Sequence, residues 1–181
     1  MPPRQTADGD WRLHAPGAGP YLFGDLLALA RRSWVRQMAD GLERAGFPDY
    51  RRSDAAIVRL LARGGLTVGR LGELIGVTRQ AARKLADGLE RRGYARTERD
   101  ELDARKLLLS LTPQGVAYAR AIVVTIDALG RELAERVAPE QLEAAEAVLR
   151  AAIVDPGDRR RVDRLVKPPA AAADPIQRDR A

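Results

Sequence analysis

The spacing of apolar residues predicts two successive helices that each bury one face. Apolar side chains recur at steps of three and four over residues 21–45 and again over residues 53–63. Gly46 ends the first pattern and Gly64 ends the second, because glycine favours the end of a helix over its continuation. The expected inward residues of the first helix are Leu27, Ala30, Trp34, Met38 and Leu42.

A shorter helix and a longer one follow in close succession. The shorter helix begins after Thr67 and ends at Gly76, and the longer one runs from Thr78 to about Arg92. Thr78 suits an N-cap because its hydroxyl can accept a hydrogen bond from the first helical turn. The expected inward residues of the longer helix are Ala82, Leu85, Ala86 and Leu89. A tight turn between two such helices is typical of a helix-turn-helix.

The pattern then changes from helical to alternating, which predicts a β-hairpin. Residues 94–97 and 106–111 have the pattern of two short strands, joined by a charged tip over residues 98–105. Helices followed by a two-stranded hairpin are the layout of a winged helix. The predicted fold class is therefore mainly α with a small β-hairpin, a winged helix-turn-helix core flanked by N- and C-terminal dimerisation helices.

Two further helices follow the hairpin. Thr112 and Pro113 form an N-cap and first-residue pair, and Pro139 opens the next helix. These two helices and the first helix carry more apolar surface than so small a core needs. A two-fold interface between two copies of the chain would bury the excess apolar surface. The alternative is that these residues pack within one chain. The expected divisions are a flexible leader (1–20), the winged domain (21–154) with dimerisation helices (21–45 and 113–154), and a flexible tail (155–181).

Composition excludes several classes of function. The 181 residues include no cysteine and one histidine, His14, so thiol chemistry, disulfides and Ser-His-Asp catalysis lose their usual side chains. The sequence contains neither a P-loop nor a dinucleotide fingerprint, and we expect no enzyme activity, cofactor or metal.

No apolar run is long enough for a membrane helix, so we expect no membrane partner and a cytoplasmic location. The net charge of +6 permits nucleic-acid binding.

The outer face of the longer helix carries side chains that read DNA. Arg79, Gln80, Arg83 and Lys84 lie opposite its apolar face. Arginine and lysine bond guanine acceptors, and glutamine can bond adenine. Thr78 and the first helical amides could hold a phosphate. The alternative is an ordinary solvated charged face, although the positive charge is concentrated at the end that enters the groove in such motifs.

Three short motifs resemble the MarR family of transcriptional regulators. They are the helix-turn-helix segment LTVGRLGELIGVTRQAARKLADGLERRGY, the segment DELDAR, and LTPQG. The resemblance extends over about residues 21–153 and is sharpest over residues 66–115. It implies a winged helix-turn-helix homodimer that binds a pseudo-palindromic DNA operator. It also implies a small-molecule effector as a possible partner, for which we assign no residues.

The same resemblance assigns roles to the predicted wing. It implies that Arg105 enters the minor groove and that Asp103 pairs with a nearby arginine to hold the wing in shape; an ordinary charged hairpin tip is the alternative. The family often has arginine where this chain has Thr97. Strand alternation turns the neighbouring Arg96 to the other face.

These observations together predict a sequence-specific DNA-binding transcriptional regulator, a repressor that acts as a homodimer and that a small ligand releases. The alternative is a winged-helix module for protein contacts without specific DNA binding. The basic half of the longer helix favours DNA. The predicted DNA-binding residues are Thr78, Arg79, Gln80, Arg83, Lys84, Asp103 and Arg105.

Overall fold

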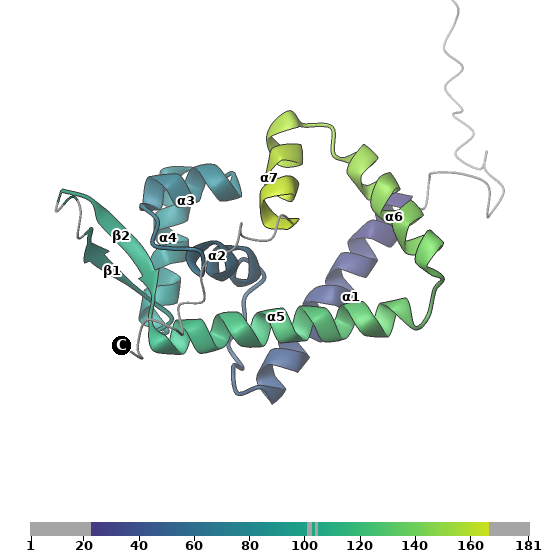
Figure 1. Cartoon of the computed structure of the whole chain (residues 1–181), viewed down its shortest axis with the longest axis horizontal. Helices are drawn as coiled ribbons and strands as arrows, with labels where there is room; N and C mark the ends of the chain where they lie inside the picture. The colour runs from purple at the N-terminus through teal and green to yellow at the C-terminus, as the bar shows by residue number, and fades with distance from the viewer. Residues whose placement is uncertain (1–22, 101–102, 104, 167–181) are drawn as a thin grey trace, which may run out of the picture. The chain divides into compact units, whose positions relative to one another are not determined.

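The computed structural model describes residues 23–100, 103 and 105–166 (Figure 1). Seven helices and two strands lie in these residues. They are α1 (Phe23–Arg44), α2 (Asp54–Leu61), α3 (Val68–Ile75), α4 (Arg79–Arg91), β1 (Ala95–Arg99), β2 (Leu107–Leu111), α5 (Pro113–Ala134), α6 (Pro139–Ala152) and α7 (Pro156–Val166). This order confirms the predicted winged helix-turn-helix. The predicted leader, residues 1–20, lies outside the described residues.

The chain divides into two compact units, residues 1–36 and 37–181, with the boundary inside α1. In the first unit, Leu27 and Ala30 are exposed, although the helical pattern predicted that they face inward. The predicted inward residues Met38 and Leu42 lie in the second unit and are buried. Periodicity identifies an apolar face correctly, but it does not tell whether that face is covered within one chain.

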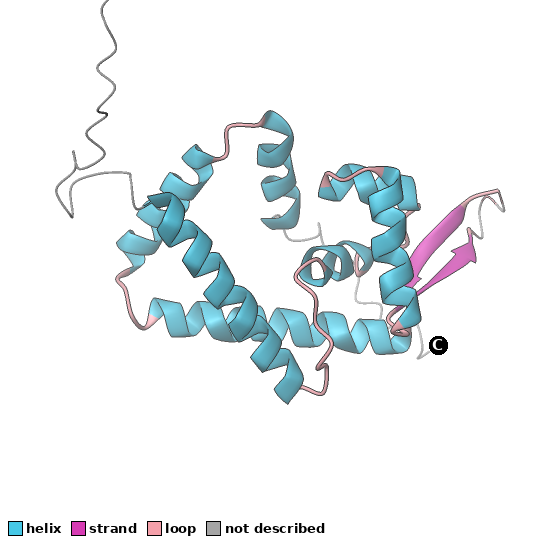
Figure 2. Cartoon of the chain, turned by 180° about the vertical axis from the view of Figure 1, so that it is seen from behind, coloured by secondary structure: helices cyan, strands magenta, loops and turns pink. Residues whose placement is uncertain are grey.

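The core of the second unit is built around the helix-turn-helix and the hairpin. In Figure 1, α3 and α4 lie beside β1 and β2, and α2 contacts both α5 and β2. The hairpin is antiparallel with Thr97 opposite Leu109, and it projects from the helices as a wing (Figure 2). The buried apolar residues include Ile57, Val58, Leu71, Ala82, Ala86, Leu89, Leu109 and Ile122.

Three threonines begin helices as the sequence predicts. The side-chain oxygens of Thr67, Thr78 and Thr112 accept hydrogen bonds from backbone N–H groups three residues later, at 3.2, 3.2 and 3.0 Å. Thr112 also donates its hydroxyl hydrogen to the carbonyl of Gly93, at 2.6 Å. This threonine therefore joins the end of α4 to the start of α5.

Two positions near this junction require glycine for steric reasons. Gly93 has φ of 75°, a left-handed conformation that side chains disfavour, and it turns the chain from α4 into β1. Gly115 lies so close to the carbonyl of Tyr94 that a Cβ would collide with that backbone. Both positions therefore need glycine if α4, β1 and α5 are to meet as they do.

A buried carboxylate connects the helices of this unit. Asp54 lies at the start of α2, and its side chain is 2% exposed. It accepts hydrogen bonds from both terminal nitrogens of Arg92, at 2.8 and 3.1 Å, from the Tyr118 hydroxyl at 2.8 Å, and from the Arg51 backbone N–H at 3.0 Å. Ser53, the predicted cap of this helix, makes no capping bond with its side chain. Sequence analysis did not identify this network.

Aromatic rings cover the same junction. The rings of Tyr94 and Tyr118 stack with centroids 4.2 Å apart, and Phe47 packs against both. The Tyr94 hydroxyl donates to Asp49 at 2.7 Å. Burial, together with the nearby Asp54 carboxylate, raises the pKa of Tyr118 well above its ordinary value. Burial opposes the charge of Arg92, but hydrogen bonds and attraction from Asp54 outweigh this effect and raise its pKa.

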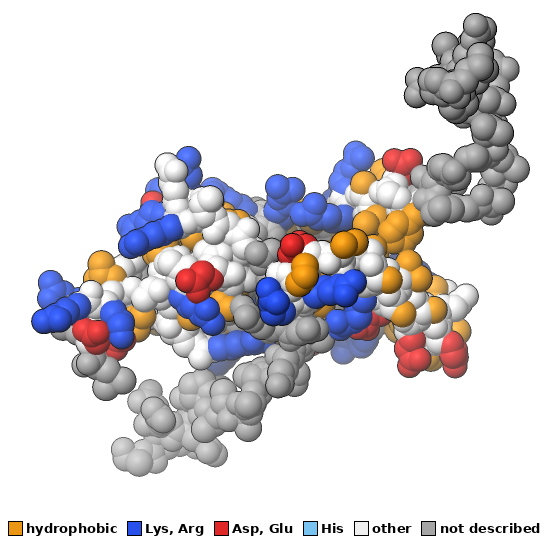
Figure 3. Space-filling model, turned by 90° about the horizontal axis from the view of Figure 1, so that it is seen from above, with side chains coloured by type: hydrophobic (Ala, Val, Ile, Leu, Met, Phe, Trp, Pro, Cys, Tyr) orange, Lys and Arg blue, Asp and Glu red, His pale blue; other side chains and the backbone are white. Residues whose placement is uncertain are grey.

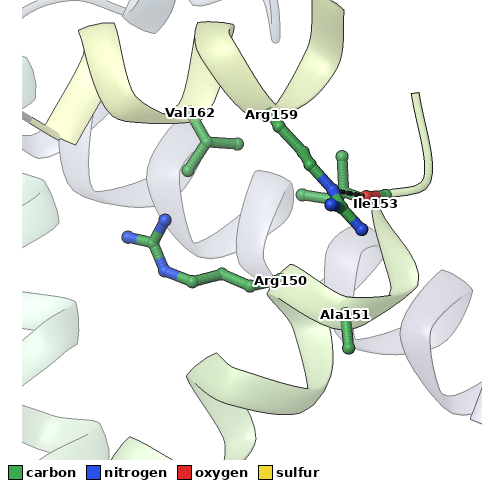
Figure 4. Close-up of a pocket in the computed structure, with 5 residues that line it drawn as sticks. All are labelled: Arg150, Ala151, Ile153, Arg159 and Val162. Atoms are coloured by element: carbon green, nitrogen blue, oxygen red, sulfur yellow. Dashed lines mark hydrogen bonds between the residues drawn. The ribbon is translucent and has the colours of Figure 1, made fainter. Parts of the chain in front are cut away.

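A seventh helix lies where the sequence predicted a flexible tail. Asp155 caps α7 by accepting the backbone N–H of Asp158 at 3.0 Å, and α7 contacts α2. Arg159 returns to the end of α6, where its Nε donates to the carbonyl of Ile153 at 2.6 Å (Figure 4). The density of charged residues favoured a mobile segment, but charged residues are compatible with a capped helix. Residues 167–181 of the predicted tail lie outside the described residues.

We predict that Asp54→Asn lowers the free energy of unfolding by about 3 kcal/mol, because it removes the nearest counter-charge of the buried Arg92 guanidinium. Urea denaturation followed by circular dichroism measures this change. Asp87→Asn is the matched control: it also removes a carboxylate from an arginine–aspartate pair, but that pair is exposed and contributes under about 1 kcal/mol. Equal losses in the two variants would contradict the structural role of Asp54.

We also predict that stability falls as the pH rises above the ordinary tyrosine pKa of 10.0, because Tyr118 ionises in the unfolded chain but keeps its proton when folded. The contribution of Tyr118 to the free energy of unfolding is intact below that pH. Above that pH the contribution is lost at up to about 1.4 kcal/mol per pH unit. Denaturation at several pH values measures the slope. Tyr118→Phe should show a shallower decline between pH ~10 and ~11, and an unchanged slope would exclude Tyr118 as its source.

Candidate nucleic-acid interface

One open groove runs between the helix-turn-helix and the wing. The first turns of α3 and α4 form one side, and the two strands form the other. Four cationic side chains and one amide face it. The residues that line the groove are Thr67, Val68, Gly69, Arg79, Gln80, Arg83, Thr97, Arg105, Lys106 and Leu107.

The predicted residues of α4 divide between the groove and its surroundings. Arg79 and Gln80 are exposed and line the groove. Arg83 also lines it, but its Nε is paired with Asp87 Oδ1 at 2.8 Å, and Glu90 lies 3.9 Å from the same guanidinium. Lys84 is exposed and does not line the groove. The structure thus brings three of these four side chains together.

Thr78 is exposed at the N-terminus of α4. Its oxygen accepts the Ala81 N–H, which leaves the hydroxyl hydrogen available to donate. A helix N-terminus also carries partial positive charge, because its first N–H groups have no partners within the helix. Thr78 is therefore placed to bind an anionic group beside the groove.

Asp103 shapes the wing through bonds that differ from those expected. Its carboxylate accepts the backbone N–H of Arg105 at 3.1 Å and pairs with Lys106 Nζ at 3.2 Å. These two hydrogen bonds lower the pKa of Asp103. The expected pairing with an arginine side chain is therefore wrong: a lysine takes that place, and the guanidinium of Arg105 remains exposed on the groove.

Strand alternation assigns the remaining wing residues to two faces. Thr97 faces the groove, whereas Arg96 pairs with Glu98 at 2.9 Å. Sequence analysis predicted that Arg96 turns away, but it omitted Thr97 and Lys106 as site residues. The alternation of side chains along the two strands is the signal that could have identified them.

The groove is suited to an elongated polyanion. Lys and Arg side chains lie at the wing end of the molecule in the space-filling view, with a few carboxylates among them (Figure 3).

Among the described residues, no group of three or more histidine, cysteine, aspartate or glutamate side chains could hold a metal ion. Within the same residues, no helix is long and apolar enough to cross a membrane.

Comparison with known proteins finds a family model that matches part of this chain and solved structures that share its fold. The sequence model of the MarR family matches residues 49–106, which include α2, α3, α4 and most of the wing. The comparison with curated proteins finds no match.

Three solved structures illustrate the fold. A probable transcriptional regulator from Pseudomonas aeruginosa has 21% identity and a TM-score of 0.60, over 72% of this chain and 96% of its own. MarR from E. coli, as a mutant complexed with operator DNA, has 18% identity and a TM-score of 0.61, over 74% and 94%. YusO from Bacillus subtilis has 21% identity and a TM-score of 0.54, over 76% and 99%. At these identities the likeness establishes a shared fold.

Proposed function

We propose that this chain, a member of the MarR family of winged-helix proteins, is a transcriptional regulator that binds double-stranded DNA. The observation that carries this proposal is the groove, because it combines cationic side chains from α4 and from the wing along one surface. In a helix-turn-helix the second helix enters the major groove of DNA and places its N-terminal residues at the base edges. Arg79, Gln80 and Arg83 occupy those positions on α4.

The wing would complete the contact. Arg105 lies across the groove from α4, where it can enter the neighbouring minor groove, whose negative potential attracts arginine. Lys84 and Thr78 lie beside the groove and would contact phosphates. Asp103 would act indirectly, since its bond to the Arg105 backbone shapes the wing tip.

We further propose that the protein binds a pseudo-palindromic operator as a homodimer. Helix α6 buries none of its residues within the chain, and it exposes Val148 and Leu149. The first unit exposes Phe23, Leu26, Leu27 and Leu29 in the same way. A second copy of the chain would cover such surfaces and would present two recognition helices to two half-sites.

Repression and release by a ligand complete the proposal. A dimer on an operator would exclude other proteins from that DNA, which supports a repressor. We propose the cytoplasm as its location. A groove between residues 37–45, which include the end of α1, and α5 is a candidate place for a small-molecule effector, because apolar Val124 and Leu129 meet cationic Arg44 and Arg120 there. Ligand binding beside the proposed dimer helices would bias their packing.

We predict that Arg79→Ala and Arg105→Ala each weaken binding to an operator duplex by about 1–3 kcal/mol if the side chain reads bases, and lower the salt slope by about 1 if it contacts phosphate. Fluorescence anisotropy across a salt series, with the duplex upstream of the gene and a scrambled duplex, measures both. Arg96→Ala is the matched control, since that arginine lies on the opposite face of the wing. Wild-type binding in both groove variants would refute the assigned surface.

Equal and weak binding of the wild-type chain to both duplexes would call for a genome-wide selection of bound fragments. If that selection enriched no sequence, it would favour the alternative function, a winged-helix module for protein contacts.

We predict that the double variant Val148→Asp with Leu149→Asp is monomeric, because both added carboxylates would otherwise enter an apolar interface.

 Buried carboxylates without counter-charges oppose association. Sedimentation equilibrium measures the mass of the particle, and circular dichroism checks that the helices remain. Leu107→Asp is the control, because it places a carboxylate on an exposed apolar residue of the wing, away from α6. A double variant that stays dimeric would remove α6 from the interface.

A further inference from the structure

The Thr97 hydroxyl is the one buried side-chain polar atom, among the described residues, that has no hydrogen-bond partner. Thr97 lies at the centre of β1, opposite Leu109 of β2, and faces the groove. Its neighbours Arg96 and Glu98 pair with each other on the other face of the strand. The residue that carries the unpaired hydroxyl therefore lines the groove.

An unpaired hydroxyl at this position costs stability in the free protein. A buried polar group loses its bonds to water, and this loss is not offset when no protein group replaces them. Valine has nearly the same shape and suits a β-strand equally well, without that cost. Packing and strand propensity thus give no reason for threonine at residue 97, whereas a partner that arrives from outside the chain does.

The position of Thr97 indicates which part of DNA would arrive there. Arg79 and Gln80 line one side of the groove, and Arg105 lines the other. In the proposed complex the first two side chains face the major groove and Arg105 faces the adjacent minor groove. One sugar–phosphate backbone separates two adjacent grooves of a duplex, so that backbone would pass over Thr97.

We infer that the Thr97 hydroxyl donates a hydrogen bond to a phosphate oxygen of the DNA backbone and thereby determines affinity. Threonine hydroxyls are common partners of phosphates. The arginines that line the same groove are long and exposed, so their side chains can move when DNA binds. The bond would satisfy the unpaired atom only in the complex. This inference rests on the proposed function.

The test compares Thr97→Val with Thr97→Ser on an operator duplex across a salt series. We expect Thr97→Val to weaken binding about tenfold at every salt concentration, as for a lost hydrogen bond to a charged group. The salt slope should stay unchanged, because no cation is removed. Thr97→Ser should bind within about twofold of wild type, since it keeps the hydroxyl.

Thermal unfolding supplies the second readout. Thr97→Val should melt at the wild-type temperature or above it, because it removes an unpaired buried hydroxyl; if it fails to fold, Thr97→Ala replaces it in the binding assay. Wild-type affinity in the variant without the hydroxyl would overturn the inference and leave the proposed function standing. Failure of the wild-type chain to bind any duplex would instead overturn both.

Discussion

The winged-helix core depends on the pairing of one buried carboxylate. Asp54 begins α2, and it binds Arg92 at the end of α4 and Tyr118 on α5. A carboxylate this deeply buried is tolerated only when hydrogen bonds and a counter-charge replace water. The three helices must therefore meet with their bonding atoms in place, and small displacements at this point would leave buried charge unpaired. The stacked rings of Tyr94 and Tyr118 exclude water from the same junction.

This anchor lies at one end of α4, and the proposed DNA-reading residues lie at the other. Arg92 is held by Asp54 and by the carbonyl of Gly88, whereas Arg79 is exposed at the N-terminus. The helix is thus fixed through its buried end, and its cationic end remains accessible. Along the same helix, the pairing of Arg83 with Asp87 limits the positions of that guanidinium in the free protein. The buried end of α4 therefore fixes the orientation of the helix, and its exposed N-terminal end carries the residues proposed to contact DNA.

Sequence analysis predicted the features that depend on local pattern. Apolar spacing, threonine caps and alternation gave the helix-turn-helix and the wing, and the predicted residues Arg79, Gln80, Arg83 and Arg105 meet in one groove. It did not identify the Asp54–Arg92 pair, because the partners are 38 residues apart and each resembles an ordinary surface charge. It also missed Thr97: strand alternation could have placed this side chain on the groove face, but the proposed role of Thr97 rests on a buried hydroxyl without a partner. No local pattern reports that a hydroxyl is buried and unpaired.

The long helix α5 connects the two halves of the proposed mechanism. Tyr118 on its buried face bonds to Asp54, whereas Val123 and Val124 are exposed on the same helix. In the proposed homodimer, a partner or an effector that shifts α5 would displace the Tyr118 hydroxyl from the Asp54 carboxylate. The adjustment would pass through Asp54 to Arg92, and hence to the end of α4. The bonds of Asp54 thus connect α5, a helix of the proposed dimer interface, to the C-terminal end of α4.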